Sequence, residues 1–143
     1  MTQEGKTLAE LLVVIGIVAI VAGMALPSFL TFNSRTQLRS AAEEIASELR
    51  LAKQLALTYH DRVRIRIDLD QQELLTQFVR SGVTHHVYRY SNKSVVIEES
   101  TAGPEILFHP SGRSATATTV SIRSPEGQSQ KLTVSMTGRV SIL

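Results

Sequence analysis

Residues 5–27 read GKTLAELLVVIGIVAIVAGMALP, and this stretch decides the fold. No residue from Leu11 to Leu26 is charged. The stretch from Leu11 to Phe32 is long enough to cross the hydrocarbon core of a membrane, which takes roughly 20 predominantly apolar residues in a helix. Glu10 lies at its edge, where a carboxylate costs free energy unless it is paired or reaches water. The stretch therefore predicts a membrane helix and marks Glu10 as a functional candidate.

Two other interpretations of residues 1–30 stay open. A secretory signal would explain the apolar run, and Ala22–Leu26 offers small residues for cleavage, but the first residues, MTQEG, lack the basic charge of such signals. A buried core helix that is apolar on all sides would need many partners. The rest of the chain supplies only about 100 residues, enough for one small core.

Within the predicted membrane helix, Pro27 is expected to introduce a kink, because proline has no backbone N–H and its ring clashes with the preceding turn. Neighbouring helices can satisfy the backbone groups that such a proline frees. Gly16 and Gly23 are small positions at which a second helix can approach closely. The segment is therefore suited to contact with other helices inside the membrane.

Gly5-Lys6-Thr7-Leu8-Ala9-Glu10, followed by an apolar run with Pro27, resembles the class III signal of type IV pilins and type II secretion pseudopilins. The resemblance implies that a prepilin peptidase cleaves between Gly5 and Lys6 and N-methylates Lys6. Glu10 then becomes the fifth mature residue and Pro27 the twenty-second. It also implies that Glu10 pairs with the terminal amine of an adjacent subunit and so sets the register of a filament.

After Pro27 the apolar residues recur at three- and four-residue spacing, which predicts an amphipathic helix that packs on a sheet. Its stripe is Leu38, Ala42, Ile45, Leu49, Ala52, Leu55 and Ala56. Asn33 or Ser34 caps a second helix if the membrane helix breaks there; otherwise one helix continues to Tyr59. From Arg62 the period becomes two, which is typical of a half-buried strand. The expected strands are 62–70, 74–79, 86–90, 94–98, 105–109, 116–122, 131–136 and 139–143.

The end of the chain resembles the C-terminal domain of the pseudopilin H and FimT family, in the segments 108–114 (FHPSGRS) and 132–140 (LTVSMTGRV). The expected fold class is α+β, with a long N-terminal pilin helix packed on the antiparallel β-sheet of a small C-terminal domain. The expected domains are a leader peptide (1–5), a transmembrane and filament-core helix (6–32), an amphipathic half-helix (33–60) and a β-rich periplasmic domain (61–143).

Composition and motifs disfavour catalysis. The chain contains no cysteine, so thiolate metal sites and thiol nucleophiles are excluded. It has no G-x-S-x-G nucleophile elbow, no phosphate-binding loop and no dinucleotide fingerprint. His85 and His86 are adjacent, a spacing that does not suit a metal site, and they are expected to be a solvated strand end. We therefore expect a protein that is not an enzyme and that has no cofactor and no metal.

Five arginines are candidate contacts for a partner. Arg62, Arg64 and Arg66 are expected on one strand face. They form either a solvated face neutralised in part by Asp68, Asp70 and Glu73 or a phosphate-binding stripe for DNA. Arg113 and Arg139 follow glycines in predicted turns, where such residues usually pair with surface acids. Some FimT-like proteins resemble DNA receptors with a Gly-Arg-x-Arg tail. The second arginine is missing here, so the resemblance does not carry DNA binding over.

The resemblance implies a minor pseudopilin of a type II secretion system, which is assembled into a periplasmic pseudopilus that supports protein export. Its implied partners are other pilins or pseudopilins, the prepilin peptidase, the inner-membrane assembly platform and membrane lipid, with DNA as a less favoured ligand. The implied location is the inner membrane, single-pass, with a cytoplasmic N-terminus and a periplasmic C-terminal domain. The alternatives are a minor type IV pilin that primes pilus assembly or DNA uptake, and a membrane-anchored binding domain that never polymerises.

Overall fold

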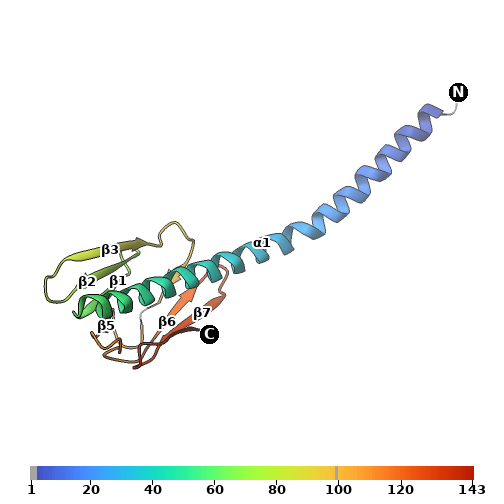
Figure 1. Ribbon diagram of the computed structural model, residues 1–143. Helices are drawn as coiled ribbons and strands as arrows, with labels where there is room; N and C mark the ends of the chain where they lie inside the picture. Colours follow the sequence, from blue (N-terminus) through green and yellow to red (C-terminus); the bar gives the residue numbers. More distant parts are fainter. Residues whose placement is uncertain (1–2, 99) are drawn as a thin grey trace. The chain divides into compact units, whose positions relative to one another are not determined.

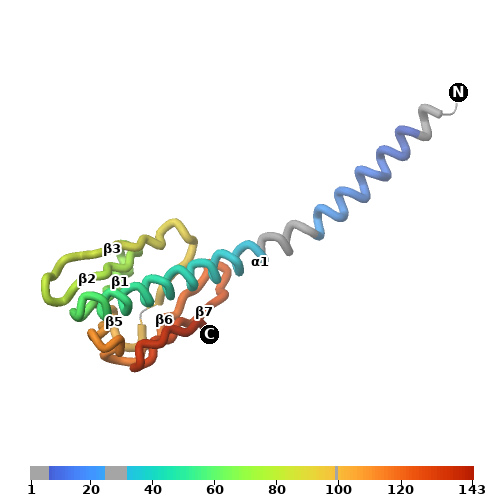
Figure 2. The backbone as a smooth tube through the Cα atoms, in the orientation of Figure 1, coloured from blue at the N-terminus to red at the C-terminus, as the bar shows by residue number. Residues whose placement is uncertain are grey.

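The computed structural model describes the backbone of residues 3–98 and 100–143 and the side chains of residues 7–24, 32–98 and 100–143. The described residues form one α-helix followed by eight β-strands, as Figure 1 and the backbone tube of Figure 2 show. The chain divides into two compact units, Met1–Ser34 and Arg35–Leu143. The first is helical, whereas the second is α+β.

Helix α1 spans Gln3–Tyr59. The sequence left open a break at Asn33 or Ser34, but the helix passes through both residues without one. In the second unit one face of α1 is buried, and it contains every residue of the predicted apolar stripe, together with Ala41 and Ala46. The small residues on this face allow other elements to approach the helix closely. The interpretation of the stripe as core packing is confirmed.

Eight strands follow the helix, and all neighbours in the sheets are antiparallel. They are β1 Val63–Asp68, β2 Glu73–Phe78, β3 Thr84–Arg89, β4 Val96–Ile97, β5 Glu105–Phe108, β6 Thr118–Arg123, β7 Ser129–Val134 and β8 Val140–Ile142. They form two four-stranded sheets with the orders β3-β2-β1-β5 and β4-β6-β7-β8. The sequence predicted each strand to within a few residues but placed them in a single sheet, because periodicity does not reveal that β5 pairs with β1 and β4 with β6.

The inward faces of both sheets and the buried face of α1 form one hydrophobic core. Strand β1 shows the expected alternation, with Val63, Ile65 and Ile67 buried. The largest fully buried side chains are Tyr90 and Phe108. In Figure 1, β2 and β3 of the first sheet lie above the C-terminal half of α1, and β6 and β7 of the second sheet lie below it. This packing holds the outer faces and the connecting turns of the domain in place.

Three turns share one hydrogen-bond pattern: His109–Arg113, Ser124–Gln128 and Ser135–Arg139. In each, the N–H of the first residue donates to the carbonyl of the fifth, at 2.8–2.9 Å, and the glycine N–H donates back to the carbonyl of the first. The glycines have φ values of 77° (Gly112), 84° (Gly127) and 72° (Gly138). A three-residue loop with a glycine in the left-handed conformation is a common hairpin connection. The predicted turn segments therefore share one defined geometry.

Candidate functional site

The N-terminal part of α1 exposes apolar side chains on all sides. The stretch Thr7–Met24 has a mean hydropathy of 2.4, and none of it is buried within the protein. Leu11 is 62% exposed and Met24 75%. Moving each large apolar side chain from water to an apolar environment is favourable by roughly 1.5–3 kcal/mol of free energy. This surface therefore requires lipid or other apolar helices around it. The length and composition of the stretch suit a membrane span.

Glu10 is exposed on this helix, next to the apolar surface. Among the described residues no cation forms an ion pair with it. The space around Gly16 and Gly23 is open, with no atom within 4 Å of the position that a Cβ would take. The other predicted processing and assembly residues, Gly5, Lys6 and Pro27, have side chains outside the described set. Their roles stay predictions.

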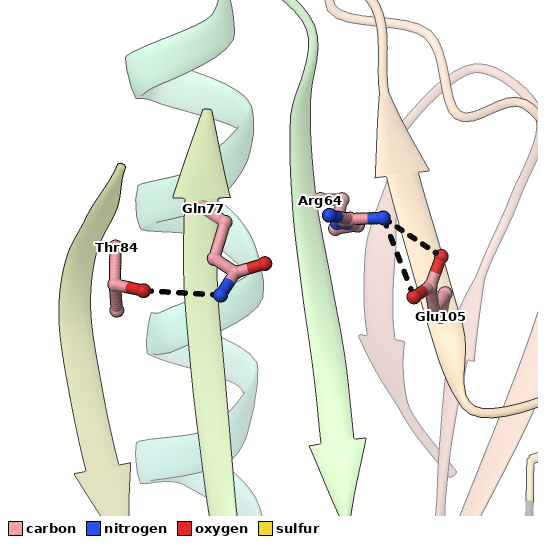
Figure 3. A network of polar contacts seen from close by, with 4 residues as sticks. All are labelled: Arg64, Gln77, Thr84 and Glu105. Carbon is pink, nitrogen blue, oxygen red and sulfur yellow. Dashed lines mark hydrogen bonds and ion pairs between the residues drawn. The ribbon is translucent and has the colours of Figure 1, made fainter. Parts of the chain in front are cut away.

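The predicted arginine stripe has different partners from those expected. The Arg64 guanidinium lies 3.5 Å from both carboxylate oxygens of Glu105, on the neighbouring strand β5 (Figure 3). The expected neutralising acids are engaged elsewhere: Glu73 pairs with Arg89, and Asp68 accepts backbone N–H bonds in the β1–β2 turn. Figure 3 also shows Gln77 donating to Thr84 between β2 and β3.

Two arginines beside Arg64 keep their charge exposed. Arg62 and Arg66 form no ion pair with any described residue. Arg66 lies opposite Leu75 on one side and Glu105 on the other in the strand register. The first sheet therefore presents a mixed outer face of arginines, one partly neutralised, and half-buried apolar side chains.

A polar cluster that sequence reasoning did not find connects α1 to strand β3 and the loop after it. The Glu44 carboxylate accepts hydrogen bonds from the Tyr88 hydroxyl at 2.7 Å and from the Lys93 ammonium at 2.8 Å. One turn further along the helix, Glu48 Oε1 lies 3.6 Å from His86 Nε2. These helix residues look like ordinary surface acids in the sequence. The only signal was that Glu44 and Glu48 border the apolar stripe.

Hydrogen bonds to Lys93 and then Tyr88 are the main causes that lower the pKa of Glu44 below its ordinary value of 4.5. For Tyr88, burial comes first and the Glu44 hydrogen bond second, and both raise its pKa above the ordinary value. Burial, followed by the charge of Asp68, raises the pKa of Tyr90 to about 12. Ionised Glu44 is thus favoured in the folded protein, and so are neutral tyrosines.

These shifts predict how stability depends on pH. A carboxyl with a lowered pKa in the folded state stabilises the protein above its unfolded pKa, and this contribution is lost as pH falls through the folded value. We expect Glu44→Gln to lose less stability than the parent protein as the pH falls from neutral to below the ordinary carboxyl pKa of 4.5. Urea unfolding of the full-length protein in detergent, followed by tyrosine near-ultraviolet circular dichroism, measures this difference.

Glu43→Gln is the matched control, because Glu43 is an exposed acid whose pair with Arg39 lies on the surface. Such i,i+4 pairs contribute only about 0.3–0.5 kcal/mol. An equal change in acid sensitivity for Glu43→Gln and Glu44→Gln would contradict the role of the cluster.

The histidine pair is exposed near the start of β3, as the sequence predicted, but each histidine has a neighbour that the sequence did not reveal. His86 does have a carboxylate nearby, the Glu48 group from α1, and His85 contacts Phe78 edge-on with the ring centroids 5.7 Å apart. Neither contact builds a metal site: in the part of the chain that the structure describes, no group of three or more His, Asp or Glu residues is placed to hold an ion. His86 therefore belongs to the attachment of β3 to the helix, whereas His85 packs against β2.

Arg113 and Arg139 are exposed and occupy the same position in two of the three similar turns. Sequence reasoning treated these turns as separate. In the structure their glycines are buried and close together, and Lys53 of α1 donates a hydrogen bond to the Gly138 carbonyl at 3.1 Å. Nothing in the local pattern of either turn shows that the two meet.

Residues 41–138 match a family model described as "Type II transport protein GspH". The match begins in the buried half of α1 and ends at the glycine of the last turn. It contains all of β1 to β7 and both glycines of the two adjacent turns.

Two solved structures share the fold. One is the type IV minor pilin FimU of Pseudomonas aeruginosa, with a TM-score of 0.67 and 21% identity, over 78% of this chain and 92% of that one. The other is the minor pseudopilin EpsH from the Type 2 Secretion System of Vibrio cholerae, with a TM-score of 0.62 and 18% identity, over 75% and 96% of the two chains.

A curated relative matches over a shorter stretch. A "Fimbrial protein" of Pseudomonas aeruginosa is 38% identical over 55 residues, which is 38% of this chain and 35% of that protein. The match thus spans about a third of the relative's length.

Proposed function

This chain belongs to the family of the type II transport protein GspH, and on that premise we propose that it is a minor pseudopilin, assembled into a periplasmic pseudopilus that supports protein export. The observation that carries the proposal is one helix with two surfaces. Its stretch Thr7–Met24 is apolar and unburied, whereas the part beyond Arg35 packs into a domain of the GspH type.

In this proposal the apolar helix has two successive environments. It first holds the protein in the inner membrane as a single span, with the N-terminus in the cytoplasm and the β-rich domain in the periplasm. Extraction by the assembly platform then transfers the same apolar surface from lipid to the neighbouring helices of the filament. Both environments remove the surface from water, so the transfer between them requires no large gain or loss of hydrophobic free energy.

A minor type IV pilin that primes pilus assembly or DNA uptake is the second candidate. The observation that favours it is the similarity to FimU and to the fimbrial protein of Pseudomonas aeruginosa. An anchored domain that never polymerises is the third candidate. It requires neither a glycine at position 5 nor a carboxylate at position 10, so both residues argue against it.

Deletion of the gene separates these roles. For a pseudopilin we expect loss of secreted proteins from the culture medium, with surface pili and DNA uptake unchanged, and restoration of secretion by the full-length chain. Loss of pili or of DNA uptake, with secretion intact, would assign the protein to the second candidate. A normal result in all three measurements would favour the third.

Processing at Gly5 supplies a separate prediction. A peptidase that cleaves after glycine has access to a backbone without Cβ, so even a methyl group is expected to hinder the approach. We expect Gly5→Ala to raise the unprocessed fraction several-fold, read as the intact mass of protein purified from membranes. Thr7→Ala is the control with the same small side chain near the cleavage point. Wild-type mass for Gly5→Ala, or wild-type protein that begins at Met1, would contradict processing at this site.

A further inference from the structure

The turns His109–Arg113 and Ser135–Arg139 touch through their glycines, although 25 residues separate Gly112 from Gly138 in a chain of 143. A Cβ on Gly138 would overlap with the carbonyl oxygen of Gly112 and lie 3.1 Å from its carbonyl carbon. The approach therefore requires a glycine at position 138, and both glycines are in the left-handed conformation. We call these two loops together the double turn.

The double turn is held rigidly. The Ser114 N–H donates to the Met136 carbonyl at 3.1 Å and so links the two loops. The Lys53 ammonium donates to the Gly138 carbonyl at 3.1 Å and ties them to α1. A Cβ on Gly112 would lie 3.2 Å from side-chain atoms of both Lys53 and Leu57, so the helix closes the inner side. Only the outer side is open to a partner.

Each touching glycine is followed by an exposed arginine, Arg113 or Arg139. The Cα atom of each arginine is about 3.8 Å from that of its glycine, so both long side chains start beside the same contact. Neither forms an ion pair with a described residue. From residue 106 to residue 143 Glu126 is the only acidic residue, so the segment that contains both turns carries a net positive side-chain charge.

We propose that the double turn is a docking surface for an acidic segment of another protein, whose carboxylates bind to Arg113 and Arg139. A guanidinium matches a carboxylate with two parallel hydrogen bonds, and arginines on two touching turns match a segment with two acids. Met136 lies in the same loop and is 53% exposed, which adds an apolar contact. Arginine and methionine are both enriched in protein interfaces.

The same surface is poorly built for nucleic acid. Salt-dependent binding to duplex DNA draws on many phosphate contacts, commonly about six to ten, whereas the double turn offers two arginines. Its ten residues, HPSGR and SMTGR, include no Phe, Tyr or Trp on which a single-stranded base would stack. Charge complementarity with a short acidic protein segment is therefore the better match.

The choice of a protein partner rests on the proposed function, in which this domain contacts other subunits. The binding site itself does not depend on that function. Binding to the purified full-length protein in detergent, outside any filament, tests the site alone. If the chain bound an acidic peptide but entered no filament, the binding site would be supported and the proposed function would be wrong.

The probe is a fluorescent octaglutamate peptide, with binding followed by fluorescence anisotropy at low salt. We expect Arg113→Gln/Arg139→Gln to weaken binding about ten-fold or more, because two charge-assisted contacts are lost. The double variant Arg113→Lys/Arg139→Lys keeps the charge but not the planar fork of the guanidinium. Its affinity for the peptide is expected to fall between those of the wild type and the Gln double variant. The control Arg35→Gln/Arg80→Gln removes the same charge from exposed arginines near the start of the second unit and after β2, which form no ion pair with a described residue. It is expected to change binding less than about two-fold.

Equal losses for the two pairs of variants would overturn the proposal, since binding would then follow net charge alone. So would an absence of binding by the wild-type chain. A DNA duplex of about 20 base pairs is added as competitor at matched charge concentration. If DNA displaces the peptide and binds more tightly through the same arginines, the surface is a nucleic-acid site and the proposal is wrong.

Discussion

Replacing Gly138 with alanine is expected to lower the free energy of unfolding of the domain by about 3 kcal/mol or more, from two separate causes. The residue has a φ of 72°, and the left-handed conformation costs an L-residue with a Cβ roughly 1–2 kcal/mol. The new methyl group would also overlap with the carbonyl oxygen of Gly112. Relief requires a shift of one backbone against another, and overpacking of this kind costs about 1–3 kcal/mol.

A shift at this point also disturbs the hydrogen bond from Lys53 to the Gly138 carbonyl. Strands β7 and β8 lie on either side of the turn, so the loss is expected to spread into the second sheet. In a domain of this size, such a change lowers Tm by more than about 10 °C. Urea unfolding of the full-length protein in detergent measures the free energy, with tyrosine near-ultraviolet circular dichroism as the signal.

Gly127→Ala is the matched control. Gly127 has the same place in a turn with the same hydrogen bonds and a φ of 84°, but no atom lies within 4 Å of its Cβ position. Gly127→Ala is therefore expected to lower the free energy of unfolding by about 1–2 kcal/mol, the cost of the left-handed conformation without any overlap. If Gly127→Ala and Gly138→Ala destabilised the domain equally, the contact between the two turns would have no energetic weight.

The comparison of Gly127 with Gly138 also shows which structural features can be predicted from the sequence and which cannot. The spacing of the apolar residues predicted the buried face of α1 and each of the eight strands, because helix and strand periods are local properties. The glycines at 112, 127 and 138 look alike in the sequence, since each ends a short polar loop. Only the pairing of the strands into two sheets brings the first of them against the third.

The same limit applies to the charged residues. Asp68 and Glu73 are near Arg64 and Arg66 in the sequence and were expected to neutralise them, yet Arg64 contacts Glu105, 41 residues away. Glu44 has its partners 44 and 49 residues away, in Tyr88 and Lys93. Local patterns predict which faces are polar, but the partner of each charge depends on long-range strand pairing. Glu10 differs from both cases, because its predicted partner belongs to another chain.

For Glu10→Ala we expect normal residence in the membrane and incorporation into filaments reduced by about ten- to a hundred-fold. A charged group in the apolar part of a membrane helix costs about 2.5–3.5 kcal/mol. If Glu10 pairs with the terminal amine of an adjacent subunit, the two charges neutralise each other among apolar helices. Without the carboxylate the amine stays unpaired there, and the expected range corresponds to a loss of about 1.4–2.8 kcal/mol. The apolar stretch Thr7–Met24 is otherwise unchanged, so insertion into lipid is not impaired.

The measurement is the ratio of this protein to the major subunit in sheared filaments, compared with the same ratio in membranes. Glu43→Ala is the control, since it removes an exposed carboxylate from the same helix and only a surface pair with Arg39 is lost. Glu10→Gln keeps the shape and a hydrogen-bonding group but not the charge, so it separates the two contributions. If Glu10→Gln assembled like the wild type while Glu10→Ala did not, hydrogen bonding and shape rather than charge would set the register. If Glu10→Ala itself assembled normally, neither contribution would be needed, and the apolar surface alone would direct the helix into the filament.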